Sequence, residues 1–138
     1  MRPVPQVISL LKSSTTLTDL VGQHIYADNP PQDDMTPIVV LSVLSSIAYG
    51  TVDNCSVRAY TSRLTVDVVT DSRSQSEQVI EIIEDLLDGF SNVVDPTHPI
   101  AGIIVEGGID WEILNPVDGS DQRGYLCSQY FNINYRRI

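Results

Sequence analysis

The chain of 138 residues is 42% hydrophobic and 19% charged, which is typical of one folded domain and excludes a disordered chain. Its 18 acidic and 8 basic residues give a formal net charge of -10, so the backbone of a nucleic acid would be repelled unless the basic side chains were clustered. The basic residues are scattered along the sequence, which disfavours duplex DNA as a ligand, although the charge suits a surface that DNA slides past. The longest near-continuous apolar stretch, residues 37–44, is far shorter than the roughly 20 residues of a membrane helix, and we expect no membrane partner.

The start of the chain predicts two short helices. Apolar residues recur at helical spacing over residues 4–12, behind a proline that a first helical turn tolerates. Thr16 can cap a second, shorter helical turn, and Gly22 can end that turn in the left-handed conformation. The segment HIYADNPPQDDMTPIVV, residues 24–40, then brings together one histidine, three aspartates and three prolines. It is either a small acid-rich site or a connector.

Two strands joined as a long hairpin are predicted next. Residues 37–46, PIVVLSVLSS, hold few polar positions and are expected to form a strand buried on both faces. Residues 58–70 alternate apolar and polar side chains, the pattern of a strand with one buried face. Turn-forming residues such as Gly50 and Asp53 lie between the two strands, which favours a hairpin.

The clearest predicted helix lies within residues 72–90, SRSQSEQVIEIIEDLLDGF. Ser74 and Glu77 have the spacing of a capping box, and Gly89 stands where a left-handed C-terminal cap belongs. The residues expected on the inner face of this helix are Val79, Ile82, Ile83, Leu86 and Leu87.

Three further strands are predicted after this helix. Strands over residues 101–106 and 109–115 are expected to form a tight hairpin at Gly107-Gly108. A last strand, residues 124–136, alternates an apolar face with a polar one. The order of elements predicts an α+β fold, one domain over residues 1–138 with a mostly antiparallel sheet and helices on one face.

No motif of a hydrolase, zinc protease or nucleotide-binding protein occurs, and we expect no catalytic residue, metal site or cofactor. His24 and His98 are the only histidines and stand next to loops. Asp28, Asp33 and Asp34 lack the regular spacing and the turn glycine of a calcium loop, which favours a solvated turn.

Two other groups of residues are also interpreted as structural. Asp110 and Glu112 lie two apart, where an exposed strand face is favoured over the carboxylate pair of a glycosidase. Cys55 and Cys127 have no C-x-x-C spacing and are expected to be buried free thiols.

Several stretches of the chain together resemble one family. LTDLVGQHIY at residues 17–26, the proline- and aspartate-rich loop, and TPIVVLSVLS at residues 36–45 resemble the start of the phage tail terminator family, also called tail completion or minor tail proteins of long-tailed phages. Residues 63–79 are similar to the family's sheet strand and long helix, and YFNINYR resembles its closing strand. The positions that match the opening motifs are Leu20, Val21, Gly22, Ile25, Tyr26, Pro31, Gln32, Pro37, Val39 and Val40, while Ile38 replaces the usual aromatic residue.

The resemblance implies a structural, non-enzymatic protein of the virion tail that is assembled in the host cytoplasm. Such proteins form rings, commonly hexameric, that cap the tail tube, end its elongation and present the surface for head-tail joining. The implied partners are further copies of the chain, the tail tube protein and a head-completion or neck protein, with DNA passing through the bore without specific binding. The alternative is a head-completion or neck adaptor protein of the same virion region.

A ring needs two different surfaces on each subunit. Hairpins and sheet edges can join subunits through main-chain pairing, which points to the long hairpin, the proline-rich loop and the polar face of the last strand. The expected interface residues are Tyr49, Gly50, Thr51, Val52, Asp53, Asn54, Pro31, Gln32, Asp33, Asp34, Tyr130, Asn132 and Asn134.

Overall fold

The computed structural model describes residues 4–28, 37–51, 54–94, 99–114 and 124–137. Three helices and five strands lie within these residues. In chain order they are α1 (Val4–Ser13), α2 (Thr15–Val21), β1 (Ile25–Ala27), β2 (Ile38–Thr51), β3 (Asn54–Thr70), α3 (Arg73–Leu87), β4 (Ile100–Leu114) and β5 (Gly124–Arg137).

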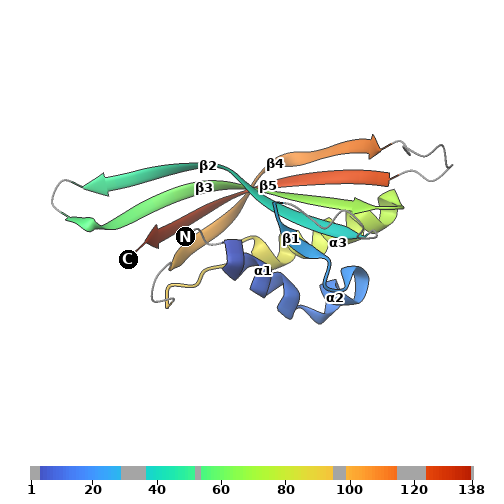
Figure 1. The fold of residues 1–138 in the computed structure, drawn as a ribbon, viewed down its shortest axis with the longest axis horizontal. Coiled ribbons are helices and arrows are strands. Elements are labelled where there is room, and N and C mark those ends of the chain that lie inside the picture. The colour runs from blue at the N-terminus through green and yellow to red at the C-terminus, as the bar shows by residue number, and fades with distance from the viewer. Residues whose placement is uncertain (1–3, 29–36, 52–53, 95–98, 115–123, 138) are drawn as a thin grey trace.

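The five strands form one sheet in the order β1-β2-β3-β5-β4. Only β1 and β2 pair in parallel, and every other neighbouring pair is antiparallel. Figure 1 shows all three helices below the sheet, while its other face carries none of the described elements. The predicted α+β fold, with a mostly antiparallel sheet and helices on one face, is confirmed.

The core lies between the helices and the lower face of the sheet. Successive side chains of a strand point to opposite faces, so alternate residues of the inner strands β3 and β5 meet the helices. In β5 the residues at odd positions from Cys127 to Tyr135 are buried, which confirms the predicted core face of the last strand. The main apolar side chains of this core are Val7, Leu11, Leu17, Val21, Leu64, Val66, Val68, Val79, Ile80, Ile83, Leu87, Cys127, Phe131 and Ile133.

The predicted capping box at the start of α3 is wrong. The N-cap residue is Ser72 and not Ser74. The Thr70 hydroxyl donates to the Ser72 carbonyl oxygen at 2.6 Å, which turns the chain into the helix directly after β3. Ser76, one turn into α3, is fully buried and shares a hydrogen bond of 2.5 Å with the same Thr70 hydroxyl. The buried pair of hydroxyls therefore fixes where the helix begins.

The inner face of α3 also differs in part from the prediction. Ile80 is buried, with Val79, Ile83 and Leu87, whereas Ile82 and Leu86 are only partly buried. The sheet lies on one side of α3 and the other two helices on another, so the buried stripe is rotated toward Ser76 and Ile80. Gly89, just after the helix, has φ +80°, as the expected left-handed residue should.

The hairpin predicted at Gly107-Gly108 is wrong, because β4 is one continuous strand from Ile100 to Leu114. Both halves of β4 pair with β5, which is 14 residues long and can accommodate them both. The register shifts between Glu106 and Asp110. Gly107 lies between these two residues and has φ +73°. Its left-handed conformation therefore belongs to a β-bulge and not to a hairpin turn.

The strand predicted as buried on both faces is buried on one face, and only near its start. Val39 and Leu41 of β2 are fully buried, whereas Leu44 and Ile47 are 57% and 56% exposed. Figure 1 shows the reason: β2 and β3 continue beyond the helices as an arm, and only the end of β5 runs beside it, along residues 58–61 of β3. We call residues 44–51 and 54–61 the β2–β3 arm. The predicted hairpin between these strands is confirmed.

Candidate assembly surfaces

The described residues hold no cluster of three or more histidine, cysteine, aspartate or glutamate side chains that could bind a metal ion. His24 is structural: its Nδ1 lies 3.2 Å from the Pro37 carbonyl oxygen, and its own carbonyl accepts the Val39 N–H. These two bonds hold β1 against β2 at the two ends of the proline-rich loop. His98 lies outside the described residues, and none of the described helices is long and apolar enough to cross a membrane.

Polar side chains from three strands join on the face of the sheet that the helices leave uncovered, which we call the open face. The Tyr130 hydroxyl donates to the Asp110 carboxylate at 2.8 Å. The Arg63 guanidinium lies 4.7 Å from the centre of the Tyr130 ring and 3.8 Å from the Glu106 carboxylate. The ring of Tyr130 is therefore held between an acid of β4 and a base of β3.

Two more hydrogen bonds extend this polar network along the strands. The Thr61 hydroxyl donates to the Asn134 side-chain oxygen at 2.7 Å, and the Ser128 hydroxyl donates to the Asp67 carboxylate at 2.5 Å. Because each bond joins β3 to β5, the network braces the two inner strands on the uncovered side.

The hydrogen bond to Asp110 raises the pKa of the Tyr130 phenol above its ordinary value, and the nearby Arg63 opposes that rise. The phenol therefore keeps its proton and remains a donor at neutral pH.

Exposed apolar side chains border the polar network. Ile47 is 56% exposed and stands opposite Thr61, which in turn stands opposite Asn134. Ile104, opposite Asn132, is 57% exposed. The open face therefore has a polar centre, with single exposed apolar side chains at its flanks.

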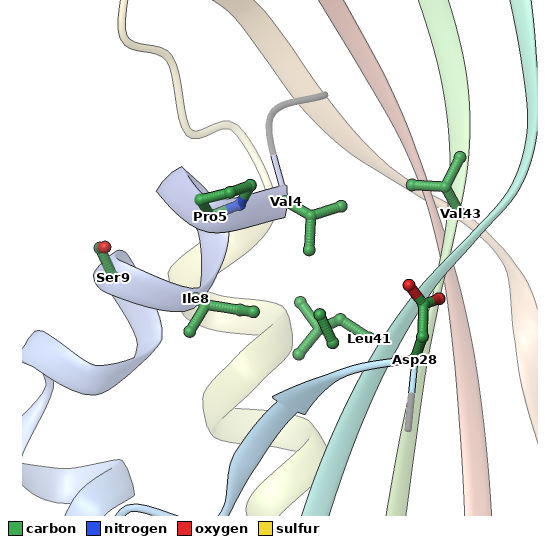
Figure 2. A pocket seen from close by; sticks show the side chains of 8 residues that line it. Val4, Pro5, Ile8, Ser9, Asp28, Leu41 and Val43 are labelled. Atoms are coloured by element: carbon green, nitrogen blue, oxygen red, sulfur yellow. The ribbon is translucent and has the colours of Figure 1, made fainter. Parts of the chain in front are cut away.

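Two hollows lie on the helix side. Figure 2 shows the larger, of about 570 Å³, where Val4 and Ile8 of α1 face Leu41 and Val43 of β2, with Asp28 at its side. The smaller, of about 450 Å³, lies between α2 and α3. Its lining carries three carboxylates, those of Asp19, Glu81 and Asp85, beside the apolar side chains of Leu20 and Ile82.

The sequence matches the family described as Tail completion protein gp17 over residues 5–103. The chain belongs to this family. It is thus a structural protein of the virion tail, and the family that its sequence motifs resemble is confirmed.

Among solved structures, this tail completion family member is similar in fold to a chain of the virion of a native gene transfer agent particle, with a TM-score of 0.64 and 14% sequence identity. The match covers 94% of this chain and 91% of the other. A search of curated protein sequences gives no match.

The structure places the expected interface residues of this family member at separate sites. Tyr130, Asn132 and Asn134 lie half-buried on the open face. Their strand, β5, is paired on both sides, so only their side chains and not their main chain could join another subunit. Tyr49, Gly50, Thr51 and Asn54 lie at the tip of the β2–β3 arm, where Thr51 is in register with Asn54.

The other expected interface residues, Val52, Asp53 and residues 31–34, lie outside the described residues. Sequence reasoning missed the acidic hollow because α2 and α3 are far apart along the chain. Helical spacing shows that Asp19 and Asp85 are exposed, but not that they share one hollow.

Proposed function

We propose that this tail completion family member forms a closed ring, of six copies, that caps the tail tube, ends tail elongation and provides the surface to which the filled head joins. The family match over residues 5–103 carries this proposal. A ring needs two unlike surfaces on each copy, and the two sides of the sheet, at β2 and at β4, differ in sequence and charge. The ring acts through contacts with the tube protein and a head-completion protein, without catalysis or a cofactor.

The charge of the chain supports a passage for DNA. A ring of six copies would carry six times -10, a formal charge of -60. Exposed carboxylates line the outer side of the helices, with Asp19 on α2 and Glu77, Glu81 and Asp85 on α3. In this proposal acidic side chains surround the bore and repel the DNA backbone, while salt screens their mutual repulsion beyond about 8 Å.

Electron microscopy of tails assembled without this protein tests the proposal. A terminator stops tube growth, so its loss should give overlong tails that do not join heads, and supplying the protein should restore a uniform length. Tails of normal length that fail only to join heads would contradict termination and would indicate the neck adaptor role instead.

A further inference from the structure

The sheet has a long unpaired edge on β2. The Leu41 carbonyl accepts the Asp28 N–H at 2.9 Å, which ends the contacts of β1 with β2. From Ser42 to Thr51, no described residue pairs with β2 on the side away from β3. This edge, SVLSSIAYGT, carries neither charge nor proline. It therefore lacks the charges and prolines with which monomeric proteins block strand pairing.

A second unpaired edge lies on β4, at the other side of the sheet. The first part of β4 is covered, because Gly89 donates to the Ile103 carbonyl at 2.8 Å and Ile103 donates to the Phe90 carbonyl at 3.0 Å. From Glu106 to Leu114, β4 has no partner among the described strands on the side away from β5. This edge bears three carboxylates.

We propose that the free edge of β2, residues 42–51, pairs with the free edge of β4, residues 106–114, in the next copy of the chain. This inference rests on the proposed ring and identifies its subunit contact. Neighbouring strands from β2 to β4 are all antiparallel, so β2 and β4 run in opposite directions. Two copies in the same orientation then meet as an antiparallel pair, and the contact repeats head to tail around the ring.

Charge selects a second copy in this orientation. Two β4 edges would bring Glu106, Asp110 and Glu112 against the same acids of the partner, which is unfavourable. The β2 edge is uncharged, and Arg63 lies beside it on β3, in register with Ser45. The uncharged edge next to a base is the β2 edge, on the other side of the sheet. The acidic β4 edge of one copy is therefore expected to pair with the β2 edge of another copy.

The positions of the two edges are compatible with ring closure. The middle of the β2 edge, near Ser46, is in register with Ser62 and through it with Ile133 of β5. The middle of the β4 edge, at Asp110, is in register with Ser128, five residues from Ile133 along β5. Across the four strands β2, β3, β5 and β4 this is a stagger of a little over one residue per strand, close to the stagger that closes eight-stranded parallel barrels at a tilt of roughly 36°.

A proline on the β2 edge tests the pairing. The Val39 N–H points away from β3, toward His24. The N–H groups of a strand point alternately to its two sides, and the extra residue between Val43 and Ser45 shifts this alternation by one residue. The Ala48 N–H therefore also points away from β3. Ala48→Pro removes that donor without removing a bond to β3. We expect a folded chain by circular dichroism that no longer forms rings in sedimentation, whereas Ala48→Val, which keeps the N–H, forms them normally. Intact rings of Ala48→Pro would overturn the proposal.

Cross-linking in assembled tails provides a second, independent test. Ala48 and Gly108 are both exposed, and an antiparallel pair with Ser46 opposite Asp110 places them opposite each other. In a Cys55→Ser background, Ala48→Cys with Gly108→Cys should give a ladder of cross-linked subunits with a short bifunctional maleimide, while either cysteine alone should give none. Ala48→Cys with Asp19→Cys is the matched control, because α2 lies away from both edges.

The outcomes separate this inference from the proposed function. A ladder from the Ala48–Asp19 pair and none from the Ala48–Gly108 pair would assign the contact to the acidic helix side and overturn the edge pairing, with the ring intact. Normal tail length without the protein would instead contradict termination, whatever the cross-links show.

Discussion

Tyr130 illustrates what single residues of the last strand contribute. The alternation of β5 predicts that its side chain lies on the polar face, and this is confirmed. The alternation cannot identify Arg63 and Asp110 as its partners, because they come from β3 and β4 and are joined to Tyr130 only by the register of the sheet. Sequence spacing shows which side a residue faces, whereas its partners depend on contacts distant along the chain.

Cys127 is expected to make the fold less stable as the pH rises into the alkaline range. Burial, together with the nearby carboxylates of Glu77 and Asp67, raises the pKa of its thiol from 9.0 to about 11. Above pH 9 the thiol ionises in the unfolded chain but stays protonated in the folded one, which lowers the free energy of unfolding. The contribution of the protonated thiol, ~3 kcal/mol, is therefore fully present below pH 9 and is lost as the pH rises through about 11.

We expect the free energy of unfolding in denaturant titrations to fall across this range more steeply for the natural chain than for Cys127→Ala. Other groups also titrate there, so only the difference between the two chains is diagnostic. Equal slopes would show that the thiol ionises without cost in the folded state.

At the scale of elements, the sequence predicts the long helices and strands well and their connections poorly. The start of α3 is misplaced because Ser72 and Ser74 both fit a cap, and the choice depends on the Thr70 hydroxyl at the end of β3. β1 is missed because three residues carry too little pattern and their parallel partner lies beyond a loop. The glycine pair in β4 is misread because a positive φ suits a bulge as well as a turn.

The junction between β3 and α3 can be tested at its buried hydroxyl. Ser76→Ala would leave the Tyr125 carbonyl, 3.4 Å from the Ser76 hydroxyl, and the Thr70 hydroxyl with one partner fewer. We expect a loss of about 1–2 kcal/mol in the free energy of unfolding. Ser74→Ala, on the exposed side of the helix, should change stability little. A large loss from Ser74→Ala would mean that the capping box forms after all.

The bulge in β4 gives a second test at this scale. A Cβ added at Gly107 or at Gly108 meets no atom within 4 Å, but only Gly107 has a positive φ, of +73°. Gly107→Ala should therefore destabilise the chain by roughly 1–2 kcal/mol, and Gly108→Ala by less. Thermal unfolding of both variants measures the difference. Equal melting temperatures would contradict the bulge conformation.

At the scale of the whole molecule, one sheet carries helices on one side and a polar face on the other, and exposed acids of α2 and α3 lie together on the helix side. Composition alone predicts an excess of acids but not that these acids share one surface. That surface is visible only once α2 and α3 are packed side by side.

Replacing the acids of the helix side tests the role of this charge. A variant with Glu77→Gln, Glu81→Gln and Asp85→Asn should fold and form rings, because these side chains are exposed. If they surround the bore, DNA should leave particles more slowly in ejection assays. The difference should shrink at high salt, where charges are screened. Ejection at the normal rate would mean that these acids lie away from the DNA path.

The position of β5 has a consequence for synthesis. This strand is the last of the five along the chain, yet it lies between β3 and β4. While the ribosome makes the chain, the β2–β3 hairpin can close early, but β4 has no neighbouring strand until β5 emerges. Much of the sheet therefore forms late, by long-range pairing that is slow. A chain still being translated cannot present a complete pair of edges, which delays assembly until a subunit is finished.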